Sequence, residues 1–143
     1  MEKKRIVWVD DEIKTSILEP YVDEFIDNGI DIIKVKNVDG LMGVLKKEAQ
    51  DSLSAILVDI IMPPENLNYG ETKGGLRTGI VVLNEVLKED TLRNIPKVAV
   101  TNVDDVKVNE FCQEHKIPYI KKYDYFANTF VAKILEEINK NKK

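Results

Sequence analysis

The sequence predicts one doubly wound α/β domain, with a parallel sheet covered by helices on both faces. Five short apolar runs rich in β-branched residues alternate with five segments whose apolar residues recur at helical spacing. This alternation is typical of parallel strands joined by right-handed helical crossovers. A length of 143 residues with 43% hydrophobic content is enough for one core and leaves little room for a second domain, so we expect a single domain over 1–143.

The first third of the chain predicts two strand–helix pairs. Ile6–Val9 is a short β-prone run that ends at the acidic triplet Asp10–Glu12. Helical spacing of apolar residues follows over 15–28. A second strand is expected over 31–35, and a second helix over 39–49.

The third predicted strand is the most informative stretch of the chain. The run Ala55–Met62 is apolar except for one carboxylate, Asp59, and a proline pair follows it. A buried strand excludes an ionised side chain unless that side chain meets a ligand or a partner. A long polar loop with three glycines is expected over 64–78, before a helix over 79–89.

The last part of the chain repeats the alternation twice more. A strand is expected over 97–101, and a more weakly patterned helix over 104–116. A fifth strand begins at about residue 118, and an amphipathic helix over 128–139 follows it.

Polar side chains stand where four of the predicted strands end. These are Asp10 and Asp11, then Asp59, then Thr101, then Lys122. Ligand sites of such sheets lie beyond the carboxyl ends of the strands, so we expect these side chains to converge. Three neighbouring carboxylates repel one another, and one lysine offsets only one of them. A hard divalent cation with oxygen ligands, Mg²⁺ or Mn²⁺, would relieve the remaining repulsion.

The ordered motifs resemble a known family. Val9–Glu12, Val58–Pro63, Ala99–Thr101 and Tyr119–Lys122 together look like the receiver domains of bacterial two-component response regulators, the CheY-like family. The resemblance covers nearly the whole chain. It implies a flavodoxin-like sheet of strand order 2-1-3-4-5 and a stand-alone receiver without an output domain on its own chain.

The resemblance also implies a phosphorylation site with its metal ligands. Asp59 would be the phosphoacceptor. The cation, Mg²⁺ or Mn²⁺, would bind Asp11 directly and Asp10 largely through water, with Asp59 and the main-chain carbonyl of Ile61 as further ligands. An aspartyl phosphate would form and would be removed slowly by water, without any other enzymatic activity.

Further roles follow from the same resemblance. Thr101 and Lys122 would contact the phosphoryl oxygens, and Tyr119 resembles the family's aromatic switch residue. Lys121 competes for the lysine role, but strand alternation points the two lysines to opposite faces. Ile61 and Asn102 sit at positions that tune access of the hydrolytic water, and the bulk of Asn102 suggests slowed dephosphorylation.

The resemblance implies partners as well. The phosphodonor would be a sensor histidine kinase or a phosphotransfer protein, and an unidentified downstream protein would read the phosphorylated state. A homodimer could form through the face made by the helix over 104–116, the strand from 118 and the helix over 128–139. Phosphorylation would bias the segment 101–125 between two states.

Two features depart from the family pattern. Tyr123 follows Lys122 where the family usually has proline, so the bond between them is expected to be trans. The loop over 64–78 is more than ten residues longer than the expected turn. It could be a lid or partner-contact loop that brings Arg77 or Lys73 to the phosphoryl group, or a solvated insertion with glycine turns.

Composition excludes several classes of protein. A net charge of -4, from 21 basic and 25 acidic residues, argues against a nucleic-acid-binding surface. The single cysteine, Cys112, cannot form a disulfide framework within one chain, which predicts a reducing, cytoplasmic location. No apolar run approaches the roughly 18 residues of a membrane span, so no membrane association is expected.

Three other hypotheses on the function are considered from the sequence. A pseudo-receiver would keep the fold as a binding scaffold and never take phosphate. A haloacid-dehalogenase-like phosphatase would use Asp10 as its nucleophile, but that family has Asp-x-Asp where this chain has Asp10–Glu12. A flavin-binding protein is disfavoured, because the loop after the first strand is acidic and lacks a phosphate cradle.

Overall fold

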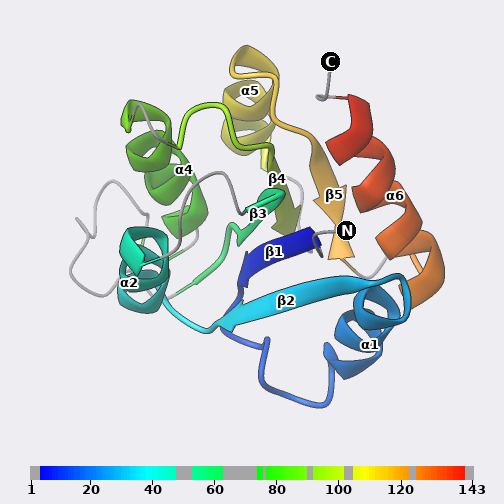
Figure 1. The fold of residues 1–143 in the computed structure, drawn as a ribbon. Helices are drawn as coiled ribbons and strands as arrows, with labels where there is room; N and C mark the ends of the chain where they lie inside the picture. The colour runs from blue at the N-terminus through cyan, green and yellow to red at the C-terminus, as the bar shows by residue number, and fades with distance from the viewer. Residues whose placement is uncertain are drawn as a thin grey trace.

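The five strands form one parallel sheet of order β2-β1-β3-β4-β5 (Figure 1). The computed structural model describes residues 4–47, 53–62, 74–75, 77–89, 92–101, 105–122 and 125–140. Every neighbouring pair of strands is parallel, which confirms the predicted doubly wound, flavodoxin-like sheet and its strand order. The strands are β1 (Lys4–Val9), β2 (Ile30–Val35), β3 (Ala55–Asp59), β4 (Lys97–Thr101) and β5 (Tyr119–Lys121).

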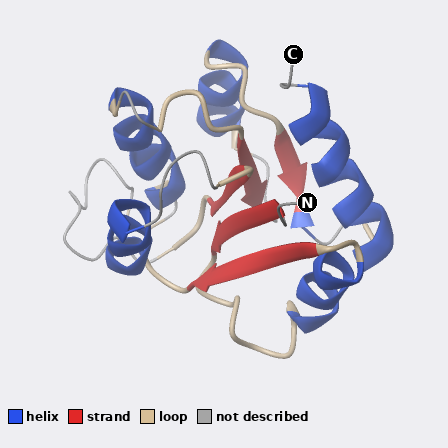
Figure 2. Ribbon diagram, viewed as in Figure 1, coloured by secondary structure: helices blue, strands red, loops and turns tan. Residues whose placement is uncertain are grey.

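Helices cover both faces of this sheet. Figures 1 and 2 show α1 and α6 together on one face, with α2, α4 and α5 on the other. No helix among the described residues is long and apolar enough to cross a membrane. The helices are α1 (Glu19–Asp27), α2 (Val38–Lys47), α4 (Thr78–Lys88), α5 (Val106–Glu114) and α6 (Ala127–Lys140).

Strand alternation divides the interior into two cores. In β1, Val7 and Val9 belong to the core under α2, α4 and α5, whereas Ile6 and Trp8 belong to the core under α1 and α6. Trp8 stacks on Phe130 of α6 with ring centroids 5.7 Å apart. Because both faces are covered, the strands are nearly continuous apolar runs, as expected of a parallel sheet.

The first helix begins later than its apolar spacing predicts. The pattern predicted a helix from residue 15, but α1 begins at Glu19. Pro20 occupies the first turn, where its missing N–H removes no helical hydrogen bond and its fixed φ suits a helix start. The remaining helix ends differ from the predicted ends by about two residues or fewer, within the usual fraying of helix ends.

The start of α4 is pressed against the end of β3. The Gly79 N–H donates to the Ile60 carbonyl at 2.9 Å. A Cβ on Gly79 would lie 2.6 Å from the Ile60 Cα and would also collide with the Asp59 carbonyl oxygen. Thr78, predicted to lie in the preceding loop, is instead the first residue of α4, and its hydroxyl donates to the Met62 carbonyl. This packing fixes the backbone directly after Asp59.

Candidate functional site

Four polar side chains are buried at the carboxyl edge of the sheet. Asp10 directly follows β1, Asp59 ends β3, Thr101 ends β4 and Lys122 directly follows β5. Their exposed fractions are 0% for Asp10, 3% for Asp59, 1% for Thr101 and 2% for Lys122. Ionisable groups are rarely so deeply buried unless they are paired or hold a ligand. The four strand ends that the sequence singles out therefore do form a buried polar edge.

Strand alternation decides which of these side chains share a face. Side chains along a strand alternate between the two faces of the sheet. By this alternation, the face under α1 and α6 is the one that carries Asp10, Asp59 and Lys122. Thr101 lies two residues after Ala99 and is therefore on the other face, under α2, α4 and α5. The charged groups thus gather on one face of the sheet edge.

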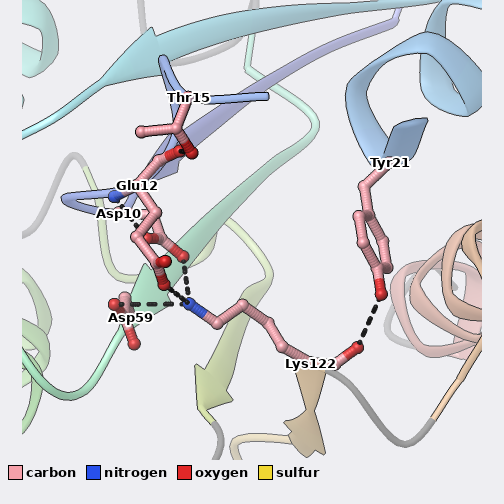
Figure 3. A network of polar contacts seen from close by, with 6 residues as sticks. All are labelled: Asp10, Glu12, Thr15, Tyr21, Asp59 and Lys122. Atoms are coloured by element: carbon pink, nitrogen blue, oxygen red, sulfur yellow. Dashed lines mark hydrogen bonds and ion pairs between the residues drawn. The ribbon is translucent and has the colours of Figure 1, made fainter. Parts of the chain in front are cut away.

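The ammonium of Lys122 lies among three carboxylates (Figure 3). Its Nζ is 2.8 Å from Asp10 Oδ2, 3.4 Å from Glu12 Oε1 and 3.7 Å from Asp59 Oδ2. Of the two neighbouring lysines, it is therefore Lys122 whose ammonium enters the site. A buried ammonium in this position offsets carboxylates that would otherwise destabilise the fold.

Burial sets the protonation of Asp59. It raises the pKa of the Asp59 carboxyl to about 8, and the charges of Asp10 and Asp11 add to the increase, whereas Lys122 opposes it. Burial and the neighbouring carboxylates therefore disfavour the ionised form of Asp59. A divalent cation nearby would favour the ionised form, which is the nucleophilic one.

The acidic triplet after β1 has the donor set of a hard cation site. Oxygen atoms of Asp10, Asp11 and Glu12 all lie within 4.8 Å of one another. Asp11 is exposed and Glu12 half-buried, so the triplet is open to solvent on one side. Burial raises the pKa of Asp11, and the neighbouring charges of Asp10 and Glu12 raise it further. Because carboxylate oxygens are the preferred ligands of Mg²⁺, the residues present fit that ion.

Glu12 was not among the predicted ligands. Asp10 and Asp11 of the predicted set belong to the triplet, whereas Asp59 contacts the site through Lys122. Ile61 is half-buried two residues beyond Asp59. The only sequence signal for Glu12 was its direct succession to the two aspartates.

Within the described part of the chain, the Thr101 hydroxyl has no hydrogen-bond partner. Its Oγ1 is buried. A buried hydroxyl without a hydrogen bond costs free energy, so native proteins rarely keep one without a reason. Here the hydroxyl stands at the edge where the charged groups converge, and a polar ligand could satisfy it.

Tyr21 joins this network from α1. Its hydroxyl donates to the Lys122 carbonyl, at an O···O distance of 3.3 Å, and to the Tyr125 carbonyl at 3.2 Å. Burial raises the pKa of Tyr21, so the hydroxyl keeps its proton. Figure 3 shows the ring reaching from α1 to the backbone of Lys122, on the side away from the ammonium. The apolar spacing over 15–28 predicted only a helix here and did not indicate a role for the Tyr21 hydroxyl.

Arg77 forms an ion pair rather than remaining free for a ligand. Its Nε donates to Asp105 Oδ2 at 2.8 Å, and its Nη2 donates to Asp105 Oδ1 at 3.1 Å. The guanidinium lowers the pKa of Asp105, whose carboxylate also caps α5 by accepting from the Lys107 N–H. The pair joins the start of α4 to the start of α5, next to the ends of β3 and β4. Lys73 lies outside the described residues.

Of the remaining predicted residues, Tyr119 lies among those that the structure describes. Tyr119 opens β5, is half-buried, and lines a groove of about 440 Å³ beside α5 and α6. Asn102, Tyr123 and most of the predicted loop over 64–78 lie outside the described residues.

Comparison with solved structures finds receiver domains at low sequence identity. The CheY-like receiver domain protein from Methanospirillum hungatei is 20% identical with a TM-score of 0.73, and the match covers 97% of this chain and 96% of that one. A response regulator from Desulfuromonas acetoxidans is 19% identical with a TM-score of 0.68, over 94% and 96% of the two chains. A response regulator from Thermotoga maritima is 12% identical with a TM-score of 0.70, and the match covers 96% of this chain and 98% of that one.

Sequence comparison alone finds nothing: no family model and no curated protein matches the chain. The structural matches nevertheless extend over almost the whole length of both chains, and all three are response regulators. Together with the parallel sheet of order β2-β1-β3-β4-β5, they show that this chain has the fold of the CheY-like receiver domains of response regulators.

Proposed function

We propose that the protein is a phosphoacceptor signalling module, in which Asp59 takes a phosphoryl group in the presence of Mg²⁺ and thereby changes partner binding. One observation carries this proposal. The buried Asp59 carboxylate has the Lys122 ammonium 3.7 Å away. At the end of the next strand, Thr101 has a buried hydroxyl that finds no hydrogen-bond partner in the part of the chain that the structure describes. A nucleophile with an ammonium 3.7 Å away, and with a buried hydroxyl at the end of the neighbouring strand, suits an incoming phosphoryl group.

The chemistry needs few protein groups. An ionised oxygen of Asp59 attacks the phosphorus of a phosphohistidine, forming an O–P bond while the N–P bond breaks and its electron pair stays on the imidazole. With acetyl phosphate the bond that breaks is the O–P bond to acetate. Most of the catalysis in such transfers is positioning and charge stabilisation.

The residues around Asp59 supply that stabilisation. Lys122 and Thr101 are the groups that can donate to the phosphoryl oxygens. A cation held by Asp10, Asp11 and Glu12 would neutralise charge that develops on the same oxygens. Hydrolysis reverses the state, since water attacks phosphorus, the acyl O–P bond breaks and the Asp59 carboxylate is regenerated with release of phosphate.

The rim of this edge is suited to a protein partner. Phe126 is 85% exposed, Val106 69% and Ile17 51%, and each lies in or next to a connection that leaves the carboxyl edge of the sheet. Large exposed apolar side chains around a polar site are typical of a docking surface. We therefore infer that a histidine kinase or phosphotransfer protein binds over the site, and that an unidentified downstream protein reads its phosphorylated state.

Labelling with a small phosphodonor tests the proposal. The protein is incubated with Mg²⁺ and acetyl phosphate and examined by intact mass, and one added phosphoryl group is expected. The adduct should be absent in Asp59→Asn and without Mg²⁺. Wild-type protein that binds Mg²⁺ but takes no phosphoryl group would favour a binding scaffold of the same fold.

Mapping the adduct separates this proposal from a phosphatase with Asp10 as nucleophile. Reduction of the acyl phosphate followed by peptide mass analysis identifies the modified residue. We expect the label on the peptide that contains Asp59. A label on the peptide that contains Asp10 would instead support the phosphatase.

A further inference from the structure

Tyr21 connects the first helix to the residue that carries the site's ammonium. Its hydroxyl donates to the carbonyl of Lys122 itself and to that of Tyr125, the two described residues that flank the connection after β5. We propose that Tyr21 is a positioning residue for phosphoryl transfer, which holds the Lys122 backbone where its ammonium reaches the acidic site. This inference rests on the proposed function.

The geometry makes the position of Lys122 depend on this contact. β5 ends at Lys121, so Lys122 lies just beyond the last residue held by strand pairing. Tyr123, not proline, follows it, so no ring restricts the backbone there. The Tyr21 hydroxyl therefore adds a restraint on the Lys122 backbone beyond the strand pairing that ends at Lys121.

The other end of the contact is rigid. Tyr21 is buried in α1, and its ring packs edge-on against Phe130 of α6, with centroids 5.1 Å apart. A ring held by two helices loses little freedom when its hydroxyl binds two carbonyls. The same helix follows the loop that carries Asp10 and Glu12, so Tyr21 ties Lys122 to the acidic residues that its ammonium must meet.

The position of the Lys122 backbone matters because its ammonium lies within reach of Asp59 by only a few tenths of an ångström. Lys122 Nζ is 2.8 Å from Asp10 Oδ2 but 3.7 Å from Asp59 Oδ2. A misplacement of about 1 Å can slow a catalysed step by roughly a hundredfold. Loss of the Tyr21 restraint should therefore affect the transfer step more than it affects the fold.

Tyr21→Phe removes only the hydroxyl and keeps the ring that packs on Phe130. At saturating Mg²⁺, we expect the rate of labelling by acetyl phosphate to fall by about tenfold or more. The Mg²⁺ affinity measured by calorimetry should stay unchanged, because Asp10, Asp11 and Glu12 are untouched. The matched control Tyr125→Phe, which removes a hydroxyl from the same connection and keeps the accepting carbonyl, should label at the wild-type rate.

A double-mutant cycle on the rate separates positioning from general loosening. In a Lys122→Met background there is no ammonium to position, so adding Tyr21→Phe should cause no further decrease. An equal decrease in both backgrounds would overturn the proposal, as would a wild-type rate for Tyr21→Phe alone. Absence of labelling in the wild-type protein would instead overturn the proposed function, so the two failures are distinguishable. Circular dichroism confirms that each variant is folded before its rate is compared.

Discussion

Thr101 carries a buried hydroxyl that lacks a hydrogen-bond partner among the described residues. Such a hydroxyl lowers the free energy of unfolding, and this loss of stability can be measured. Replacing Thr101 with the nearly isosteric valine removes the unsatisfied oxygen. We expect Thr101→Val to raise the free energy of unfolding by about 1 kcal/mol and to slow labelling by acetyl phosphate about tenfold or more. Urea denaturation and intact mass measure the two effects.

Thr78 provides the matched control, because its buried hydroxyl does have partners. It donates to the Met62 and Gly75 carbonyls. Thr78→Val should therefore lower the free energy of unfolding by about 1–2 kcal/mol. If both substitutions destabilised the protein equally, the Thr101 hydroxyl would have to be hydrogen-bonded in solution.

Lys97 shows that a buried lysine can also be structural. Its Nζ donates to the carbonyls of Leu92, Arg93 and Ile95 at 2.8, 3.0 and 2.7 Å, closing the connection between α4 and β4. Burial nevertheless lowers the pKa of Lys97 to about 8. Lys97 begins β4, whereas the candidate site lies where the strands end.

The lowered pKa of Lys97 predicts a pH dependence. The folded state holds this proton less tightly than the unfolded chain, so stability contributed by Lys97 is lost as pH falls through about 8 and is fully present above about 10.5. As pH rises between these limits, the free energy of unfolding of the wild type should increase by up to about 3 kcal/mol relative to that of Lys97→Met. Each unit by which the pKa is lowered corresponds to about 1.4 kcal/mol. Urea denaturation of both proteins at several pH values gives the difference. A difference independent of pH would mean that the hydrogen bonds to the three carbonyls balance the effect of burial on the pKa of Lys97.

At the scale of elements, the close approach of α4 to β3 depends on Gly79. Its added Cβ would collide with the backbone of Asp59 and Ile60, which cannot move aside as a flexible side chain could. We expect Gly79→Ala to lower the free energy of unfolding by about 1–3 kcal/mol and to slow labelling of Asp59, because the end of β3 must shift. Chemical denaturation and acetyl phosphate labelling test the two effects.

Gly43 of α2 is the matched control for this substitution. It is exposed and helical, and an added Cβ would meet nothing within 4 Å. Gly43→Ala should raise the free energy of unfolding by about 0.5–1 kcal/mol, because alanine loses less conformational freedom in a helix. The two substitutions should thus have opposite signs. A stabilising Gly79→Ala would show that the contact between α4 and β3 is looser than described.

For the whole molecule, the acidic triplet predicts that folding is linked to a divalent cation. A ligand that binds only the folded state stabilises it by about 2.7 kcal/mol at a hundred times its dissociation constant. We expect Mg²⁺ to raise the thermal unfolding midpoint. NaCl at equal ionic strength should raise it less, because screening relieves the repulsion of buried carboxylates only weakly.

The double substitution Asp11→Asn and Glu12→Gln should remove most of this Mg²⁺ effect, since it leaves Asp10 alone of the triplet. The same variant should be more stable than the wild type without Mg²⁺, because fewer like charges face one another. An undiminished Mg²⁺ effect would locate the ion elsewhere on the molecule.

Local sequence patterns were sufficient to predict the sheet and the residues at its edge. β-branched apolar runs alternating with helical spacing report burial, which is a local property, and they gave the order of elements and most of their bounds. Asp59 was conspicuous for the same reason, as a charge in an otherwise apolar strand. Counting from Tyr119 in the family pattern favoured Lys122 over Lys121, and strand alternation indicated that the two lysines point to opposite faces.

The contacts among these groups, by contrast, depend on how the whole chain folds. Lys122 pairs most closely with Asp10, 112 positions earlier in the chain, and its distance to Glu12 depends on how the loop after β1 folds. Tyr21 looked like one more core residue, because apolar spacing does not show where a hydroxyl ends. The lack of a partner for the Thr101 hydroxyl among the described residues was equally invisible in the sequence, since it depends on segments that are distant in the chain. Contacts between distant segments depend on the packing of the whole sheet, and no local pattern encodes them.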